Sequence, residues 1–343
     1  MTPKNRGQGF EGSRVRGVDA SDPRTLEPLN PRTLPRVVAL VGPTASGKTE
    51  LGIALAERFG AEIVNADSRQ VYRRLEVGSA KPTFAQRARV AHHLIDVAEP
   101  DEAFDCARYR QLALAAIADI RARGRRVLVV GGTGLYVKVL LRGVFEGPPR
   151  QPILRTALEQ EERSAPGSLH RRLSAVDPEA AAHLHHNDRV RLIRALEVYE
   201  LTGKPISVWQ HEHRFQQRLF DTLMLALALP RAELYARINA RCDEMLAGGL
   251  LAEVRQLLAA GVESNAAALQ SPGYREVVEY LTGHGDLESA RRRMAQATRR
   301  LAKRQLTWFR GDAEVQWCAP SFAELEARIE AFWNPDPETG QLP

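Results

Sequence analysis

The sequence predicts an α/β protein built on a doubly wound parallel sheet, and two observations lead to that prediction. Short apolar runs begin at Val37 and at Val127, and such runs are typical of strands that are buried on both faces of a parallel sheet. Longer segments with helical spacing of apolar residues alternate with them. Because ligands of such sheets bind at the carboxyl ends of the strands, the residues after each run are candidates for a functional site.

The first predicted elements follow one another closely. Residues 37–41 (VVALV) form a strand, and the helix over 49–60 ends at Gly60, which can adopt the left-handed conformation of a C-cap. Residues 61–67 (AEIVNAD) form a second strand, which ends on a carboxylate. The pattern strand, loop, helix, strand is that of a parallel sheet with crossover helices.

The later elements continue this pattern after one interruption. We expect a long amphipathic helix over 104–123 and a third strand over 127–130, which stops at the Gly-rich turn GGTGLY. Residues 153–215 are predicted to be helical and are rich in Arg and His. The apolar run at 221–230 then restores a strand of the sheet.

The simplest architecture is therefore a core that is interrupted by a helical insertion. The N-terminal stretch is rich in Pro, Gly and charge and has no apolar segment typical of a signal peptide. The predicted parts are a disordered tail over 1–35, a core over 36–146 and 219–320, an inserted domain over 147–218, and a C-terminal helix and tail over 321–343.

The amino-acid composition limits the kinds of partner that the protein is expected to bind. The 343 residues carry a net charge of +6, mostly from Arg, whose planar fork suits phosphate. This favours a polyanionic partner, although a genome rich in G and C also raises the Arg content. The three cysteines lie far apart, which predicts neither a disulfide framework nor a zinc site and fits a reducing cytoplasm. No run approaches the ~20 apolar residues of a membrane span, so we expect no membrane partner.

The stretch GPTASGKT has the spacing G-x-x-x-x-G-K-[ST], follows a strand and opens a helix. Its backbone N–H groups can surround phosphate oxygens, Lys48 can reach the terminal phosphates, and Thr49 can bind Mg²⁺. Read alone, it predicts an ATP or GTP site, and the alternative is a Gly-rich structural turn. The predicted phosphate-binding residues are Gly42, Pro43, Thr44, Ala45, Ser46, Gly47, Lys48 and Thr49.

Two further strand ends carry candidates. Asp67, at the end of the second strand, suits a metal ligand, a general base or a helix N-cap. Ser68, Arg69 and Gln70 follow it with donors suited to bases or phosphates. The glycines around Thr133 in GGTGLY permit a ligand to approach the backbone closely.

Two basic segments allow both a functional and a structural interpretation. Arg191 and Arg194 share one face of a helix over 187–199, which is either an ordinary amphipathic surface or a phosphate-binding face. Residues 297–310 combine five cationic residues with two aromatic ones, a mixture typical of nucleic-acid surfaces and also of solvated helices. Arg241 lies on a further helix, where an arginine at the rim could hold a diphosphate.

Taken together, these motifs resemble the bacterial tRNA dimethylallyltransferases, also called tRNA isopentenyltransferases. The resemblance rests on GPTASGKT, NADSRQVYRRLEVGSAKP, HHLID, GGTGLY, NDRVRLIRALEVYELTGKP, GYRE and ATRRLAKRQLTWFR, which occur in the family's order over about residues 36–311. It implies a P-loop NTPase-like core with an inserted helical tRNA-binding domain, acting as a monomer in the cytoplasm.

The implied reaction transfers a dimethylallyl group from dimethylallyl diphosphate to N6 of adenine-37 in tRNAs that read codons beginning with U. The P-loop then holds the donor's diphosphate with Mg²⁺ instead of ATP. By position in the motifs, Asp67 is the general base, Thr133 lies near the reacting centre and Arg241 clamps the diphosphate. The implied tRNA-binding residues are Asp67, Ser68, Arg69, Gln70, Val190, Arg191, Leu192, Ile193, Arg194, Gly273, Tyr274, Arg275, Lys303 and Arg304.

The chain departs from the family pattern at Pro272, where an apolar residue usually precedes GY, at Ser79 and at Val190. Three other functions share parts of the sequence. A P-loop small-molecule kinase leaves the basic insertion unexplained, and a non-catalytic RNA-binding ATPase leaves GGTGLY without a role. An adenylate isopentenyltransferase, which prenylates free AMP, ADP or ATP, needs neither the long insertion nor the basic C-terminal segment.

Overall fold

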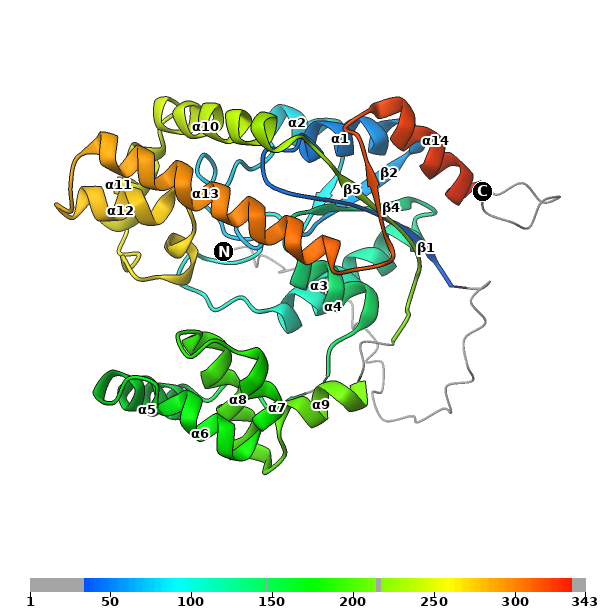
Figure 1. Cartoon of the computed structure of the whole chain (residues 1–343). Coiled ribbons are helices and arrows are strands. Elements are labelled where there is room, and N and C mark those ends of the chain that lie inside the picture. The colour runs from blue at the N-terminus through cyan, green and yellow to red at the C-terminus, as the bar shows by residue number, and fades with distance from the viewer. Residues whose placement is uncertain (1–33, 146, 214–216, 335–343) are drawn as a thin grey trace, which may run out of the picture. The chain divides into compact units, whose positions relative to one another are not determined.

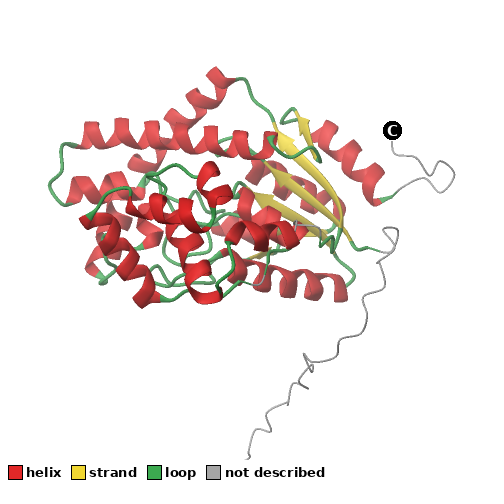
Figure 2. Ribbon diagram, turned by 60° about the horizontal axis from the view of Figure 1, so that its bottom comes forward, coloured by secondary structure: helices red, strands yellow, loops and turns green. Residues whose placement is uncertain are grey.

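A computed structural model describes residues 34–145, 147–213 and 217–334. The predicted N-terminal tail and the predicted C-terminal end lie almost entirely outside these residues. In the described part, six strands form one parallel sheet in the order β3-β2-β4-β1-β5-β6, which confirms the predicted fold class (Figures 1 and 2). The strands are β1 Arg36–Val41, β2 Ala61–Asn65, β3 His92–His93, β4 Arg126–Gly131, β5 Asp221–Leu227 and β6 Val315–Cys318.

The central strand β1 shows why the sheet is buried on both faces. Val37, Ala39 and Val41 pack into one apolar cluster, and Val38 and Leu40 pack into another on the opposite face. Successive side chains of a strand point to opposite faces, so an unbroken apolar run satisfies both. Its neighbours are β4 and β5, although β5 follows β1 only after about 180 residues of chain.

Helices cover both faces of the sheet. The helices α1 and α14 contribute Ile53, Leu55, Leu325 and Ile329 to one cluster, and α3, α4 and the helices from α10 to α13 contribute to the other (Figure 1). Their bounds are α1 Lys48–Phe59, α2 Phe84–Arg89, α3 Cys106–Ala122, α4 Gly134–Arg142, α10 Arg231–Ala247, α11 Leu250–Ala259, α12 Tyr274–Leu281, α13 Leu287–Arg310 and α14 Phe322–Trp333, with a 3₁₀ turn η2 at Ala267–Gln270.

The elements that were predicted agree with these bounds to within a few residues. His92 and His93 form the short edge strand β3, for which no strand was predicted. The strand β6 was not predicted, because only two of its four residues are buried. The basic segment 297–310 is only the second half of α13, a helix of 24 residues that begins at an Asp286 N-cap.

Residues 152–213 are helical, as expected, and share a core of their own. The side chains of Leu158, Leu169, Leu192 and Leu196 are fully or almost fully buried in it. Figure 1 shows these helices gathered together. They are α5 Pro152–Ser164, α6 Ser168–Val176, α7 Pro178–His183, α8 Arg189–Thr202 and α9 Ile206–His213.

A buried carboxylate joins two of these helices. Glu197 on α8 is fully buried and accepts hydrogen bonds of 2.8 Å from Nε and Nη2 of Arg155, from Nη1 of Arg194 and from the backbone N–H of Gln151. Burial raises the pKa of Glu197, but these donors outweigh it and hold the pKa at about 2. The carboxylate therefore ties the start of α5 to α8.

No helix in residues 34–145, 147–213 and 217–334 has the combination of length and apolar composition that a membrane crossing needs.

We predict that Glu197→Ala destabilises the helical insertion by roughly 3 kcal/mol, because it removes a fully buried carboxylate and leaves two partly buried guanidinium groups without their anion. Urea denaturation followed by circular dichroism measures the loss. The matched control is Glu200→Ala on the same helix, which removes only a partly exposed ion pair with Arg172 and should cost about 0–1 kcal/mol. Equal effects of the two substitutions would contradict a structural role for the buried pair.

The carboxylate of Glu197 also makes the stability of the protein depend on pH. Its pKa in the folded state lies below the ordinary value, so its contribution to stability is complete above about pH 4.5 and is lost as the pH falls toward about 2. Acid unfolding of wild type and Glu197→Gln, followed over this window, should show the wild type losing its advantage over the variant. A constant difference between the two proteins across the window would disprove the linkage.

Candidate active site

A pocket of about 210 Å³ opens at the carboxyl ends of β1, β2 and β4, the edge where the sequence places its candidates. It brings together Lys48, Asp67 and Arg241, which come from three distant parts of the chain. Its other lining residues are Thr44, Ala45, Ser46, Gly47, Thr49, Glu50, Ile63, Asn65, Gln70, Ser79, Ala80, Pro82, Gln86, His92, Val130, Gly131, Gly132 and Gln305.

The P-loop has the backbone conformation of an anion-binding loop. Gly42 has φ 137° and Gly47 has φ 91°, in the region that favours glycine, and Ala45 adopts φ 64°. A Cβ atom at Gly42 would lie 3.2 Å from the backbone nitrogen of Leu227 on β5, so this position also needs a small residue. Gly47 precedes α1, whose first N–H groups and positive dipole end face the pocket.

The ammonium group of Lys48 lies inside this loop. Its Nζ donates to the carbonyl oxygen of Pro43 at 2.5 Å and lies 3.4 Å from the Ser46 hydroxyl. Burial lowers the pKa of Lys48 to about 7; the carboxylate of Asp67 opposes this shift, and the cation of Arg241 adds to it. A buried cation beside a second cation is suited to an anion that carries more than one negative charge.

Asp67 and Thr133 lie in adjoining turns. Asp67 Oδ1 accepts from the backbone N–H of Arg69 at 2.8 Å and of Gln70 at 3.4 Å, so it caps the turn that follows β2. Thr133 Oγ1 accepts from the N–H of Ser68 at 3.0 Å. Thr133 does not line the pocket itself, but Gly132 beside it does. The cap engages Oδ1, and Asp67 still lines the pocket, so its catalytic assignment stays a prediction.

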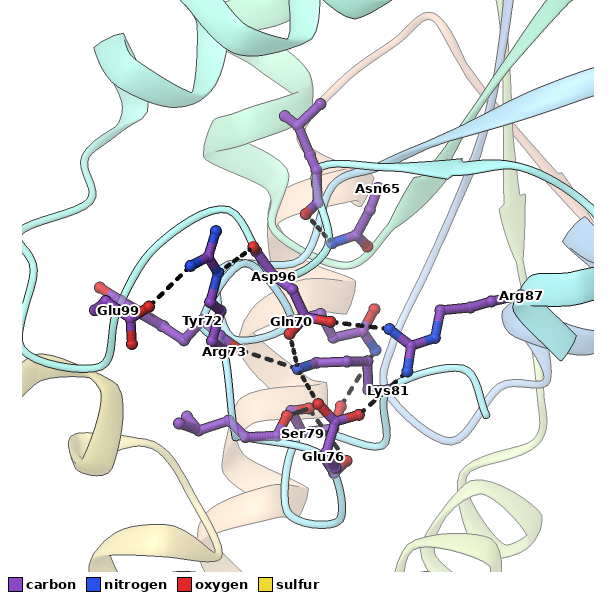
Figure 3. Close-up of polar contacts among 12 residues, drawn as sticks. Asn65, Gln70, Tyr72, Arg73, Glu76, Ser79, Lys81, Arg87, Asp96 and Glu99 are labelled. Atoms are coloured by element: carbon purple, nitrogen blue, oxygen red, sulfur yellow. Dashed lines mark hydrogen bonds and ion pairs between the residues drawn. The ribbon is translucent and has the colours of Figure 1, made fainter. Parts of the chain in front are cut away.

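The wall of the pocket beyond Gln70 is a loop held from behind by a buried lysine. Gln70 Nε2 donates to the carbonyl oxygens of Ser79 at 3.2 Å and Ala80 at 3.1 Å. Behind them the fully buried ammonium of Lys81 donates to Asp96 at 2.6 Å, to Glu76 at 2.8 Å and to the Tyr72 carbonyl at 2.9 Å (Figure 3).

Lys81 was not among the candidates, although it lies within the motif GSAKP. A lysine is usually exposed, so the sequence offers no sign that this one is buried. Ala80 and Asp96 both adopt positive φ, at 48° and 57°, which costs energy for residues with a side chain. The ion pairs of Lys81 stabilise this strained loop where it forms the pocket wall.

Gln305 is the second residue that the sequence did not single out. Its segment was expected to face tRNA, whereas its side chain points into the pocket from α13. The Thr44 N–H donates to Gln305 Oε1 at 2.8 Å, and Gln305 Nε2 donates to the Gly132 carbonyl at 3.0 Å. Gln305 thereby contacts both the P-loop and the GGTGLY turn.

The implied tRNA-binding residues of α8 separate into two kinds. Val190 is 75% exposed, and the Arg191 side chain is 65% exposed beside Asp188. The side chains of Leu192 and Ile193 are instead buried in the core of the insertion, so the expected side-chain contact is not available to them. Arg194 is bound to Glu197 and to the Pro148 carbonyl, so its charge serves the fold.

The other implied tRNA-binding residues divide in the same way. Lys303 and Arg304 on α13 are exposed, and Arg69 donates to the carbonyl oxygen of Ala267 at 2.5 Å. Tyr274 is fully buried and its hydroxyl donates to Glu253 at 2.5 Å, so its side chain serves the fold and its tRNA-binding role stays a prediction. Gly273, at φ 96°, begins α12, and Arg275 is paired with Glu276.

Comparison with known proteins shows the family to which the chain belongs. Residues 70–312 match the model of a family described as IPP transferase. The chain is 52% identical to tRNA dimethylallyltransferase 1 of Citrifermentans bemidjiense over 87% of its own length and 97% of that protein. It is 53% identical to the tRNA dimethylallyltransferase of Anaeromyxobacter dehalogenans over 86% and 99%.

Solved structures agree with the fold. The full-length tRNA isopentenylpyrophosphate transferase of Bacillus halodurans is similar at a TM-score of 0.64 with 39% identity, over 87% of this chain and 95% of that one. A eukaryotic dimethylallyltransferase, whose structure was solved acting on tRNA, reaches a TM-score of 0.74 with 28% identity, over 90% and 82%. The chain therefore belongs to the IPP transferase family.

Proposed function

We propose that this chain transfers a dimethylallyl group from dimethylallyl diphosphate to N6 of adenine-37 in tRNAs that read codons beginning with U. The observation that carries the proposal is one pocket in which a P-loop, a buried lysine and an arginine face a carboxylate, in a member of the IPP transferase family. The products are N6-dimethylallyladenosine in the tRNA and free diphosphate.

The cationic side of the pocket suits the leaving group. As the bond between the allylic carbon and oxygen breaks, its electron pair goes to the diphosphate. Lys48, Arg241 and the N–H groups at the start of α1 stabilise the charge that develops there. These donors are in place before the reaction, because the P-loop conformation and burial hold them.

The acidic side suits the acceptor. The exocyclic amine of adenine forms the new bond to the allylic carbon and becomes more acidic as it does so. Asp67, one of two carboxylates that line the pocket, lies in the turn after β2 and would accept this proton, which balances the reaction. Thr133 orients the turn that carries Asp67 through the N–H of Ser68.

We also propose Mg²⁺ as the cofactor. The described residues contain no group of three His, Cys, Asp or Glu side chains placed to hold a metal. The Thr49 hydroxyl offers a hard oxygen ligand in the pocket, and Mg²⁺ typically takes one or two protein oxygens together with phosphate oxygens and water. When bound, the ion would neutralise charge on the diphosphate.

The tRNA partner follows from the family, and the details of binding are part of the proposal. Adenine-37 must leave the stack of the anticodon loop to enter the pocket, which a single-stranded loop allows at modest cost. We propose that the helical insertion over 147–218 binds the anticodon stem and that the enzyme acts as a monomer in the cytoplasm. Exposed Arg191, Lys303 and Arg304 are among the side chains available for its phosphates.

The alternatives make separate predictions in one assay. The protein is mixed with Mg²⁺, dimethylallyl diphosphate and either an unmodified tRNA with adenine at position 37 or free AMP, and products are identified by mass. We expect N6-dimethylallyladenosine in the tRNA only. Product on AMP without product on tRNA would instead identify an adenylate isopentenyltransferase. A parallel mixture with ATP in place of dimethylallyl diphosphate tests for a kinase, which would transfer phosphate.

Asp67→Asn should lower kcat on the order of 10²-fold or more while leaving tRNA affinity within a few-fold of wild type. The amide keeps an oxygen that can cap the turn at Arg69 and Gln70 and removes only the proton acceptor. Single-turnover kinetics and filter binding measure the two quantities. Asp101→Asn, an exposed carboxylate on another turn, is the control, and an unchanged kcat in Asp67→Asn would remove Asp67 from the role of base.

Diphosphate binding should weaken as the pH rises above about 7, where Lys48 loses its proton in the protein alone. A bound anion raises that pKa, so binding above pH 7 takes up a proton, and affinity falls by up to about tenfold per pH unit. Calorimetry with inorganic diphosphate measures this for wild type and for Lys48→Arg, which stays charged. Identical pH profiles of the two proteins would show that Lys48 does not titrate in this range.

A further inference from the structure

We infer that Gln305 is a positioning residue that sets the spacing between the diphosphate half and the carboxylate half of the pocket. This inference rests on the proposed function, because those two halves are named for the donor and the acceptor of the transfer. Gln305 lies on α13 beside the exposed cations Lys303 and Arg304, yet its own side chain is half-buried and lines the pocket.

The chemistry of the amide matches the two backbone groups that it contacts. The Thr44 N–H needs an acceptor, and the Gly132 carbonyl needs a donor. A neutral carboxamide supplies both from one planar group, and the partners decide which end is oxygen and which is nitrogen. A carboxylate at this position could accept from Thr44 but could not donate to Gly132 unless it were protonated.

The P-loop is linked to the lysine of the pocket, and the GGTGLY turn is linked to its carboxylate. On the P-loop side, the carbonyl of Pro43, next to Thr44, receives the Lys48 ammonium. On the other side, Thr133, next to Gly132, receives the N–H of Ser68 in the turn of Asp67. The hydrogen bonds therefore run from the lysine through Gln305 to the turn of the carboxylate.

The packing around the amide leaves it little freedom. A Cβ atom on Gly132 would lie 2.4 Å from Gln305 Nε2 and 3.2 Å from the carbonyl oxygen of Gly42. The backbone of the GGTGLY turn therefore lies close to the backbone of the P-loop, and the Gln305 amide contacts both. A displacement of about 1 Å between reacting groups can lower the rate about 10²-fold. Because Gln305 fixes the distance between the two turns, its loss should affect kcat more than substrate binding.

Two substitutions test the inference. Gln305→Leu removes both hydrogen bonds and should lower kcat about 10–100-fold at every pH, with the KM for tRNA changed by less than about threefold. Gln305→Glu should resemble Gln305→Leu at about pH 8, but its kcat relative to wild type should rise toward about pH 5.5, where a protonated carboxyl reproduces the amide. Gln316→Leu is the control, because the exposed side chain of Gln316 on β6 accepts a hydrogen bond from Arg328 and does not line the pocket.

A readout independent of activity separates this inference from the proposed function. Hydrogen exchange of the Thr44 amide should be slow in wild type and faster in Gln305→Leu, whether or not the protein modifies tRNA. If wild type transfers no prenyl group, the proposed function fails and the exchange result alone decides the role of Gln305. An unchanged kcat in Gln305→Leu, a pH-independent ratio for Gln305→Glu, or unchanged exchange at Thr44 would each overturn the inference.

Discussion

The close contact between the turns that follow β2 and β4 is the constraint on which the site depends. A Cβ atom on Gly131 would lie 2.2 Å from the carbonyl oxygen of Ala66, so only glycine fits there. This contact brings Asp67 next to the GGTGLY turn, and the hydrogen bond from Ser68 to Thr133 continues it. The parallel sheet makes the contact possible, because β2 and β4 are neighbours that end at the same edge.

Burial changes the ionisation of the two cationic side chains in the pocket. Arg241 lies close enough to Lys48 to lower the pKa of the Lys48 ammonium, and burial lowers the pKa of both side chains. An anion of high charge relieves the mutual repulsion. A neutral ligand would not, so the pocket discriminates among ligands by charge before any contact with a base. In the proposed function, the loop, the lysine and the arginine hold the diphosphate of the donor, and that role needs no nucleotide base.

Much of the fold and part of the site could be predicted from the sequence, for reasons that differ between residues. Continuous apolar runs mark β1 and β4 because both faces of these strands are buried. The edge strands β3 and β6 are too short to produce such a run. The spacing of GPTASGKT predicted a phosphate loop because a local backbone conformation requires those residues.

Side-chain roles that depend on distant partners could not be predicted in this way. Arg191 and Arg194 look alike in the sequence, and only the buried Glu197 distinguishes the exposed cation from the structural one. Gln305 and Lys81 likewise acquire their roles from groups that are brought near them by the fold. Family resemblance supplied a region for Gln305 but not the direction in which its side chain points.

The pocket is formed by residues that lie far apart in the sequence, and this has a consequence for biosynthesis. Thr44 and Gln305 are 261 residues apart in sequence, and β1 pairs with a strand that follows the entire insertion. During synthesis at about 5–20 residues per second, the P-loop leaves the ribosome well before α13 exists. A nascent chain therefore carries the phosphate loop without its partner on α13, and the complete pocket assembles only after α13 has been synthesised.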